Sequence, residues 1–337
     1  MRYIIIGAGA VGGTIGGRLH ESGHEVVLVA RGANAAALRA RGLRLELPGG
    51  VRTLPVPVAE GPDELTPRAD DVLLLAVKTQ DTAGVLETWA GYGDGDGAGP
   101  AVVCAQNGVE NERLALRRFR DVHAMCVWLP SSHLEPGVVL APCAPLTGIL
   151  HLGRYPSGAD EVTRRIAADL AASGFGAPVS AEVMAWKYAK LIANLGNAVE
   201  AVCGPDDAES LRELTARARA EGVAVLDAAG IAHIDQRETS RVRGDRVSVQ
   251  PLEGSVRGGG SSWQSLMRGT GSIETDYLNG EIVLLGRRFG VPTPVNETLQ
   301  RAANRFARER RRPGDLTAGE RTALLGAMTG AGATTGG

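Results

Sequence analysis

Three polar residues in a strongly apolar segment have the types and spacing for acid–base chemistry. Lys190, Asn194 and Asn197 are spaced i, i+4 and i+7, so a helix over residues 186–199 would place them on one face. Most other residues from 191 to 199 are apolar, and a helix that is apolar nearly all round is normally buried. Buried polar groups cost free energy unless something pairs with them. The stripe therefore predicts a polar ligand cavity, or else polar side chains satisfied by neighbouring backbone.

The N-terminus has the pattern of a dinucleotide-binding turn. An apolar run over residues 1–6 precedes a G-x-G-x-x-G segment and a helical stretch, and a second apolar run follows over 25–30. Such a turn lets the backbone approach a pyrophosphate, while the helix N-terminus supplies free N–H donors. We therefore expect a Rossmann-type domain. The turn residues expected to contact the cofactor are Gly7, Ala8, Gly9, Ala10, Val11 and Gly12.

The residues after the second apolar run indicate which dinucleotide binds. NAD enzymes place Asp or Glu there for the adenosine ribose, whereas this chain has Ala30 followed by Arg31. A guanidinium suits a 2′-phosphate, so the sequence favours NADP over NAD. The alternative is that Arg31 is an ordinary solvated loop residue.

Two more apolar runs, over 72–77 and 101–105, read as buried strands that end in polar segments. Lys78 directly follows the first run, and Asn107 lies just after the second. Ligands of open α/β sheets bind outside the carboxyl ends of the strands, so both residues are site candidates. Post-strand loops are polar in any soluble protein, which is the competing explanation.

Length and periodicity suit two domains. The chain has 337 residues, 44% of them hydrophobic, and its pattern becomes helical from about residue 181. We predict an α/β Rossmann domain over 1–178 that binds NADP, followed by an all-α domain over 179–318 for substrate binding and dimerisation. A C-terminal extension spans 319–337, and we expect its end, 329–337, to be disordered.

Several classes of function are disfavoured. The net charge of −2 gives no basic field for nucleic acid, and no apolar run reaches the roughly 20 residues that span a bilayer. No signal peptide is apparent, and the four cysteines lack metal-ligand spacing. We expect a cytoplasmic protein with no metal, nucleic-acid or membrane partner.

Several ordered motifs together resemble the ketopantoate reductase (2-dehydropantoate 2-reductase) family over nearly the whole chain. They are the glycine turn, Lys78-Thr79-Gln80, Gln106-Asn107-Gly108, Lys190-Leu191 with Asn194, Ser261-Ser262, residues 273–280 and residues 292–297. The resemblance implies NADPH-dependent reduction of a 2-keto acid, with 2-dehydropantoate giving pantoate in pantothenate biosynthesis. It also implies a homodimer.

The same resemblance assigns roles by position. Lys190 matches the general-acid lysine, and Glu274 the acidic residue that contacts substrate and lysine. Ser262 matches the serine that holds the substrate carboxylate, Asn194 a substrate-binding asparagine, and Asn107 the residue that links cofactor and substrate.

Two departures affect the pocket for the far end of the substrate. Ala198 stands where the best-studied members have a second asparagine, and Asn197 comes one position early. Trp263-Gln264-Ser265 follows the serine pair, whereas the commoner form has glutamine three positions past the second serine, where this chain has Ser265. The identity of the substrate therefore stays open. Two alternative functions are an imine or specialised-metabolite carbonyl reductase, and an inactive NADP(H)-sensing protein that kept the fold.

The chemistry can also be argued from the residues. Hydride addition to a keto carbon leaves negative charge on oxygen, which an acid must protonate or stabilise. Lys190 on its buried face can donate that proton, and Glu274 could orient it; a purely structural ion pair between them is the competing explanation. Lys187 is a rival acid, for which we expect a solvated or phosphate-side role.

Overall fold

A computed structural model describes residues 1–93, 99–204, 208–252 and 259–329, which form two compact units. Unit 1 comprises Met1–Lys187 and Ile234–Arg257, and unit 2 comprises Tyr188–His233 and Gly258–Gly337. The division differs from the expected one, because the second stretch of unit 1 falls inside the predicted helical domain. The domain limits drawn from the sequence thus stay a prediction. The predicted disorder of 329–337 lies outside the described residues except at Thr329, which is helical.

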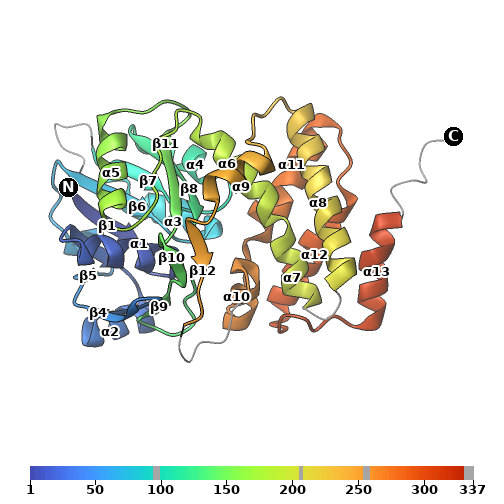
Figure 1. Ribbon diagram of the computed structural model, residues 1–337, viewed down its shortest axis with the longest axis horizontal. Coiled ribbons are helices and arrows are strands. Elements are labelled where there is room, and N and C mark those ends of the chain that lie inside the picture. Colours follow the sequence, from blue (N-terminus) through green and yellow to red (C-terminus); the bar gives the residue numbers. More distant parts are fainter. Residues whose placement is uncertain (94–98, 205–207, 253–258, 330–337) are drawn as a thin grey trace. The chain divides into compact units, whose positions relative to one another are not determined.

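The centre of unit 1 is a seven-stranded sheet in the order β11-β8-β7-β6-β1-β2-β5 (Figure 1). All neighbouring strands run parallel except β11, which is antiparallel to β8. The strands are β1 (Arg2–Ile6), β2 (Glu25–Val29), β5 (Val58–Ala59), β6 (Asp71–Leu75), β7 (Ala101–Cys104), β8 (Val122–Trp128) and β11 (Ile149–Arg154).

Alternate side chains of β1 enter two separate cores, as the two-residue period of a strand requires. Tyr3 and Ile5 belong to the core that also holds Ile15 and Ile166, whereas Ile4 belongs to the core on the other side. A parallel sheet buried on both faces needs helices on both, which accounts for the continuous apolar runs in the sequence. The helices of unit 1 are α1 (Ala10–Glu21), α2 (Gly32–Arg41), α3 (Thr79–Trp89), α4 (Asn111–Leu116), α5 (Glu161–Ala172) and α9 (Gln236–Arg243), with the short η1 (Pro62–Glu64).

Two small sheets of unit 1 are absent from the expectations. One joins β4 (Gly50–Leu54), β3 (Leu43–Leu47) and β9 (Val138–Leu140), and the other pairs β10 (Cys143–Pro145) with β12 (Val247–Val249). The antiparallel β10–β12 pairing ties the second stretch of unit 1 to the first.

Helix α6 (Val183–Asn194) begins in unit 1 and ends in unit 2, and every other regular element of the described part of unit 2 is helical. These elements are α7 (Gly196–Cys203), α8 (Ala208–Ala228), α10 (Ser261–Arg268), η2 (Glu274–Tyr277), α11 (Asn279–Phe289), α12 (Pro294–Arg308) and α13 (Ala318–Thr329). The parallel-sheet domain followed by helices confirms the predicted fold class.

The predicted helix over 186–199 is wrong in detail, because it is interrupted at Leu195, between α6 and α7. Glu274 lies in the 3₁₀ turn η2, which precedes α11. Among the described residues, no helix is long and apolar enough to cross a membrane.

Candidate functional site

The glycine turn joins β1 to α1, and each of its glycines meets a different spatial demand. Gly7 has φ +104°, a left-handed conformation in which a Cβ would also lie 2.8 Å from Val77 N. A Cβ on Gly12 would overlap the Gly7 carbonyl oxygen and lie 2.9 Å from Ile5 Cγ2. A Cβ on Gly9, in contrast, would meet no atom within 4 Å. Gly7 and Gly12 are thus required by packing, whereas Gly9 leaves an open approach to the backbone.

The turn is held against β2 and opens onto the start of α1. The amides of Gly7 and Ala8 donate to the Val29 carbonyl at 3.1 and 3.2 Å. Gly9 is the N-cap of α1, no side chain caps this end, and its first turn, which includes Ala10 and Val11, carries no acidic residue. Backbone N–H donors without a competing carboxylate suit a pyrophosphate, so the turn fits a dinucleotide.

Arg31 lies where the adenosine end of such a cofactor would be read. It is exposed, it is the N-cap of α2, and its side chain makes no capping hydrogen bond. No carboxylate occupies positions 30–34. Asn34, which the sequence reasoning missed, donates to the Ala8 carbonyl at 3.0 Å and accepts from Gly137 N at 2.8 Å, so it ties the glycine turn to a second loop.

The structure brings the segments after β6 and β7 together. Lys78 is the N-cap of α3 and is half-buried, and Thr79 Oγ1 beside it donates to the Asn107 carbonyl at 3.3 Å. Asn111 Nδ2 donates to the same carbonyl at 3.0 Å. Lys78 and Asn107 therefore lie at the carboxyl ends of adjacent parallel strands, as a ligand site in such a sheet requires.

Lys187 does not have the solvated role that the sequence suggested. Its side chain is 2% exposed, forms an ion pair with Glu112, and donates to the Gln106 carbonyl at 3.0 Å. Burial raises the pKa of the Glu112 carboxyl, and the Lys187 ammonium opposes that rise. The sequence of the polar segment after β7 did not indicate that Glu112 would pair with Lys187.

In unit 2, the polar stripe is divided between two helices. Lys190 is half-buried and Asn194 buried at the end of α6, while Asn197 lies in α7 and donates to Ser261 Oγ at 3.4 Å. Ala198 is buried in the same helix, so its methyl group replaces a polar side chain in packed surroundings.

Helix α10 packs against α7 and carries Ser262, which is 2% exposed. Glu200 Oε2 accepts from Gly260 N at 3.0 Å and joins the start of α10 to α7.

Glu274 is buried in η2, and its charge acts electrostatically on Arg268 at the end of α10. Burial lowers the pKa of the Arg268 guanidinium, and the Glu274 charge opposes that shift. Arg268 is a second cation for this region that sequence reasoning missed.

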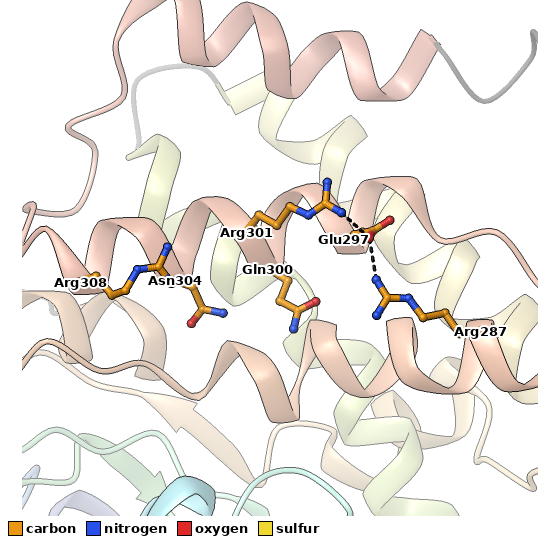
Figure 2. Close-up of a pocket in the computed structure, with 6 residues that line it drawn as sticks. All are labelled: Arg287, Glu297, Gln300, Arg301, Asn304 and Arg308. Carbon is orange, nitrogen blue, oxygen red and sulfur yellow. Dashed lines mark hydrogen bonds and ion pairs between the residues drawn. The ribbon is translucent and has the colours of Figure 1, made fainter.

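A separate hollow of about 280 Å³ lies on α11 and α12 (Figure 2). Glu297 binds Arg287 at 2.7 Å and Arg301 at 2.6 Å, and all three are solvent-accessible. Exposed pairs of this kind contribute little stability, and none of the predicted site residues lines the hollow.

The parallel sheet and the glycine turn define unit 1 as a dinucleotide-binding domain of the Rossmann type. A family model for ketopantoate reductase PanE/ApbA matches residues 3–155, and a model for the C-terminal part of the same family matches 182–307. The chain therefore belongs to the ketopantoate reductase family. It is an oxidoreductase that works with a nicotinamide dinucleotide.

Individual relatives are distant but cover almost the full length. The 2-dehydropantoate 2-reductase of Archaeoglobus fulgidus is 27% identical over 307 residues, which are 88% of this chain and 95% of the relative. The counterpart from Pyrococcus horikoshii is 25% identical over 313 residues, 89% of this chain and 95% of the relative.

Solved structures agree with the fold. The PanE/ApbA family ketopantoate reductase of Ralstonia eutropha superposes with a TM-score of 0.75 at 28% identity, covering 92% of this chain and 99% of that one. A D-mandelate dehydrogenase in complex with NADH and anilino(oxo)acetate reaches 0.76 at 21% identity, covering 92% and 99%. At that identity, the second match shows a shared fold alone.

Proposed function

We propose that this protein reduces a 2-keto acid to a 2-hydroxy acid with NADPH, and that 2-dehydropantoate is its substrate. The observation that carries the proposal is the presence of the main catalytic and substrate-binding candidates in a chain of this family. Lys190, Asn194, Ser262 and Glu274 accompany the cofactor turn, although a protein that only senses the cofactor would need the turn alone.

Each residue has a defined part in this chemistry. Residues 7–12 would hold the dinucleotide, which when bound would supply a hydride to the keto carbon while the electron pair of the C=O bond moves to the keto oxygen. Lys190 gives its ammonium proton to that oxygen, so that a hydroxyl forms. Ser262 binds the carboxylate of the substrate, Asn194 and Asn197 also bind the substrate, and Asn107 contacts both substrate and cofactor. Glu274 orients Lys190 and accepts a hydrogen bond from the distal hydroxyl.

NADPH is preferred over NADH in this proposal because Arg31 is exposed and no carboxylate lies near it in the α2 N-terminus. Arg31→Ala should remove most of the difference in affinity, about 1–3 kcal/mol for a charge-assisted contact. Fluorescence titration with both cofactors measures it. Equal affinity of the unmodified protein for NADPH and NADH would refute the preference.

A substrate panel tests the proposal as a whole. A site that bonds a hydroxyl can reject an analogue without it by up to about 10⁴–10⁵-fold, so ketopantoate should exceed ketoisovalerate in kcat/KM by at least about tenfold. Glu274→Gln should narrow that preference. Comparable turnover of both acids, or activity only on cyclic imines, would replace ketopantoate by the carbonyl or imine alternative. Absence of turnover with intact NADPH binding would favour the sensor.

Two further expectations belong to the same proposal. The resemblance implies a homodimer, which light scattering across the micromolar range would test; a monomer throughout would exclude it. A cytoplasmic location also remains a prediction.

A further inference from the structure

The ion pair between Lys187 and Glu112 is fully enclosed in unit 1. Their side chains are 2% and 0% exposed. Lys187 Nζ also donates to the Gln106 carbonyl at 3.0 Å, so the ammonium binds both ends of the segment from 106 to 112. Asn107, the candidate contact to both cofactor and substrate, lies between those two ends.

Side chains of α3 and α4 hold the same segment from within. The Asn107 carbonyl accepts from Thr79 Oγ1 at 3.3 Å and from Asn111 Nδ2 at 3.0 Å. Thr82 Oγ1 donates to Asn111 Oδ1 at 2.8 Å and accepts from Gln106 Nε2 at 2.7 Å. The backbone of Asn107 is therefore held by side chains. The Lys187–Glu112 ion pair adds a charged contact to this network.

The Lys187–Glu112 ion pair and its hydrogen bonds are poorly suited to stabilising the fold alone. Glu112 Oε2 and Gln106 Oε1 are buried and have no hydrogen-bond partner among the described residues. Buried ion pairs give weak net stabilisation compared with apolar side chains of similar volume, above all when polar atoms stay unsatisfied. A purely structural role would be met better by an apolar contact.

We propose that the Lys187–Glu112 pair is a positioning element that fixes the 106–112 segment so that Asn107 faces cofactor and substrate. The proposal rests on the function assigned to Asn107 above. Lys187 touches neither ligand in this role; it acts through the backbone that carries Asn107.

A second buried pair supplies a matched control. Arg2 Nε binds Asp71 Oδ1 at 2.7 Å, with side chains 6% and 0% exposed. It lies at the amino ends of β1 and β6, whereas Asn107 follows the carboxyl end of β7. Removing this pair should affect stability without affecting Asn107.

The test is a double-mutant cycle of Lys187→Met with Asn107→Ala. Lys187→Met should lower kcat/KM by about 10–100-fold, because a misplacement of about 1 Å at a reacting site costs up to that factor. In the Asn107→Ala background, the further loss should be below about threefold. Arg2→Met should change kcat/KM by the same small factor in both backgrounds. Equal losses from Lys187→Met in both backgrounds would overturn the proposal.

Two additions keep the result interpretable. If Lys187→Met does not fold, Lys187→Met with Glu112→Gln removes both charges; it should fold and still show the loss in kcat/KM, and wild-type activity in it would overturn the proposal. The cycle is also run on the NADPH dissociation constant. If the unmodified protein reduces no 2-keto acid, the proposed substrate is wrong, and the cycle on NADPH binding then decides the positioning role alone. Non-additive effects of Lys187→Met and Asn107→Ala on the NADPH dissociation constant support that role, and additive effects refute it.

Discussion

The same added methyl group should lower stability at one glycine of the cofactor turn and NADPH affinity at another. In Gly12→Ala the Cβ overlaps the Gly7 carbonyl oxygen and lies 2.9 Å from both Ala76 Cβ and Ile5 Cγ2. Backbone cannot yield as a flexible side chain does, so we place the cost at or above about 3 kcal/mol, the upper end of overpacking. That corresponds to a fall in Tm on the order of 6–12 °C.

In Gly9→Ala the Cβ meets no protein atom within 4 Å, and stability should change by less than about 1 kcal/mol. The methyl group would instead occupy the approach to the backbone that a pyrophosphate needs, and NADPH should bind about 10–100-fold more weakly. Thermal unfolding without cofactor and fluorescence titration with NADPH separate the two effects. Wild-type NADPH affinity in Gly9→Ala, or a wild-type Tm in Gly12→Ala, would refute the reasoning.

Three other perturbations have defined outcomes. Lys190→Ala should lower kcat by about 10²–10⁴-fold and leave the NADPH dissociation constant within about threefold. Steady-state kinetics and fluorescence titration with NADPH measure the two quantities, and an unchanged kcat would exclude Lys190 as the acid. Burial lowers the pKa of His151 to about 4, so the fold holds neutral imidazole and loses stability as the pH falls from about 6.5 to 4. His151→Leu should remove roughly 2–3 kcal/mol of the stability difference between pH 7.5 and 4.5 in urea unfolding, and an unchanged difference would contradict the assignment. Asn296→Ala should cost about 2–4 kcal/mol, because fully buried Asn296 bonds Asn279, the Ala218 carbonyl and Glu221; a loss below about 1 kcal/mol in the same assay would contradict it.

The sequence was most informative for the main sheet of unit 1. Strands β1, β6 and β7 are buried at nearly every residue, so they appear as continuous apolar runs, and the glycine spacing after β1 fixes the turn. The sheet of β4, β3 and β9 escaped prediction because β4 is exposed along nearly its whole length. A short exposed strand has no hydrophobic period to detect, and β9, which pairs with β3, lies far away in the chain.

The break between α6 and α7 shows a different limit. Residues 186–199 are helical by propensity and pattern, yet the Leu195 carbonyl accepts a hydrogen bond from Asn279 Nδ2 at 3.2 Å. A side chain that takes a main-chain carbonyl competes with the helical ladder at that point. Asn279 is distant in sequence, so the local pattern does not show this contact.

Lys187 and Lys190 illustrate why the candidate acid could not be chosen by spacing alone. Residues three apart are neighbours on a helix, and both lysines lie in the same apolar segment. What separates them is Glu112, which is buried against Lys187 from a position 75 residues earlier in the chain. The Lys187 side chain is 2% exposed and binds Glu112 and the Gln106 carbonyl. A general acid must reach the substrate oxygen in every turnover, so the enclosed ion pair argues against Lys187 in that role and favours Lys190, which is half-buried.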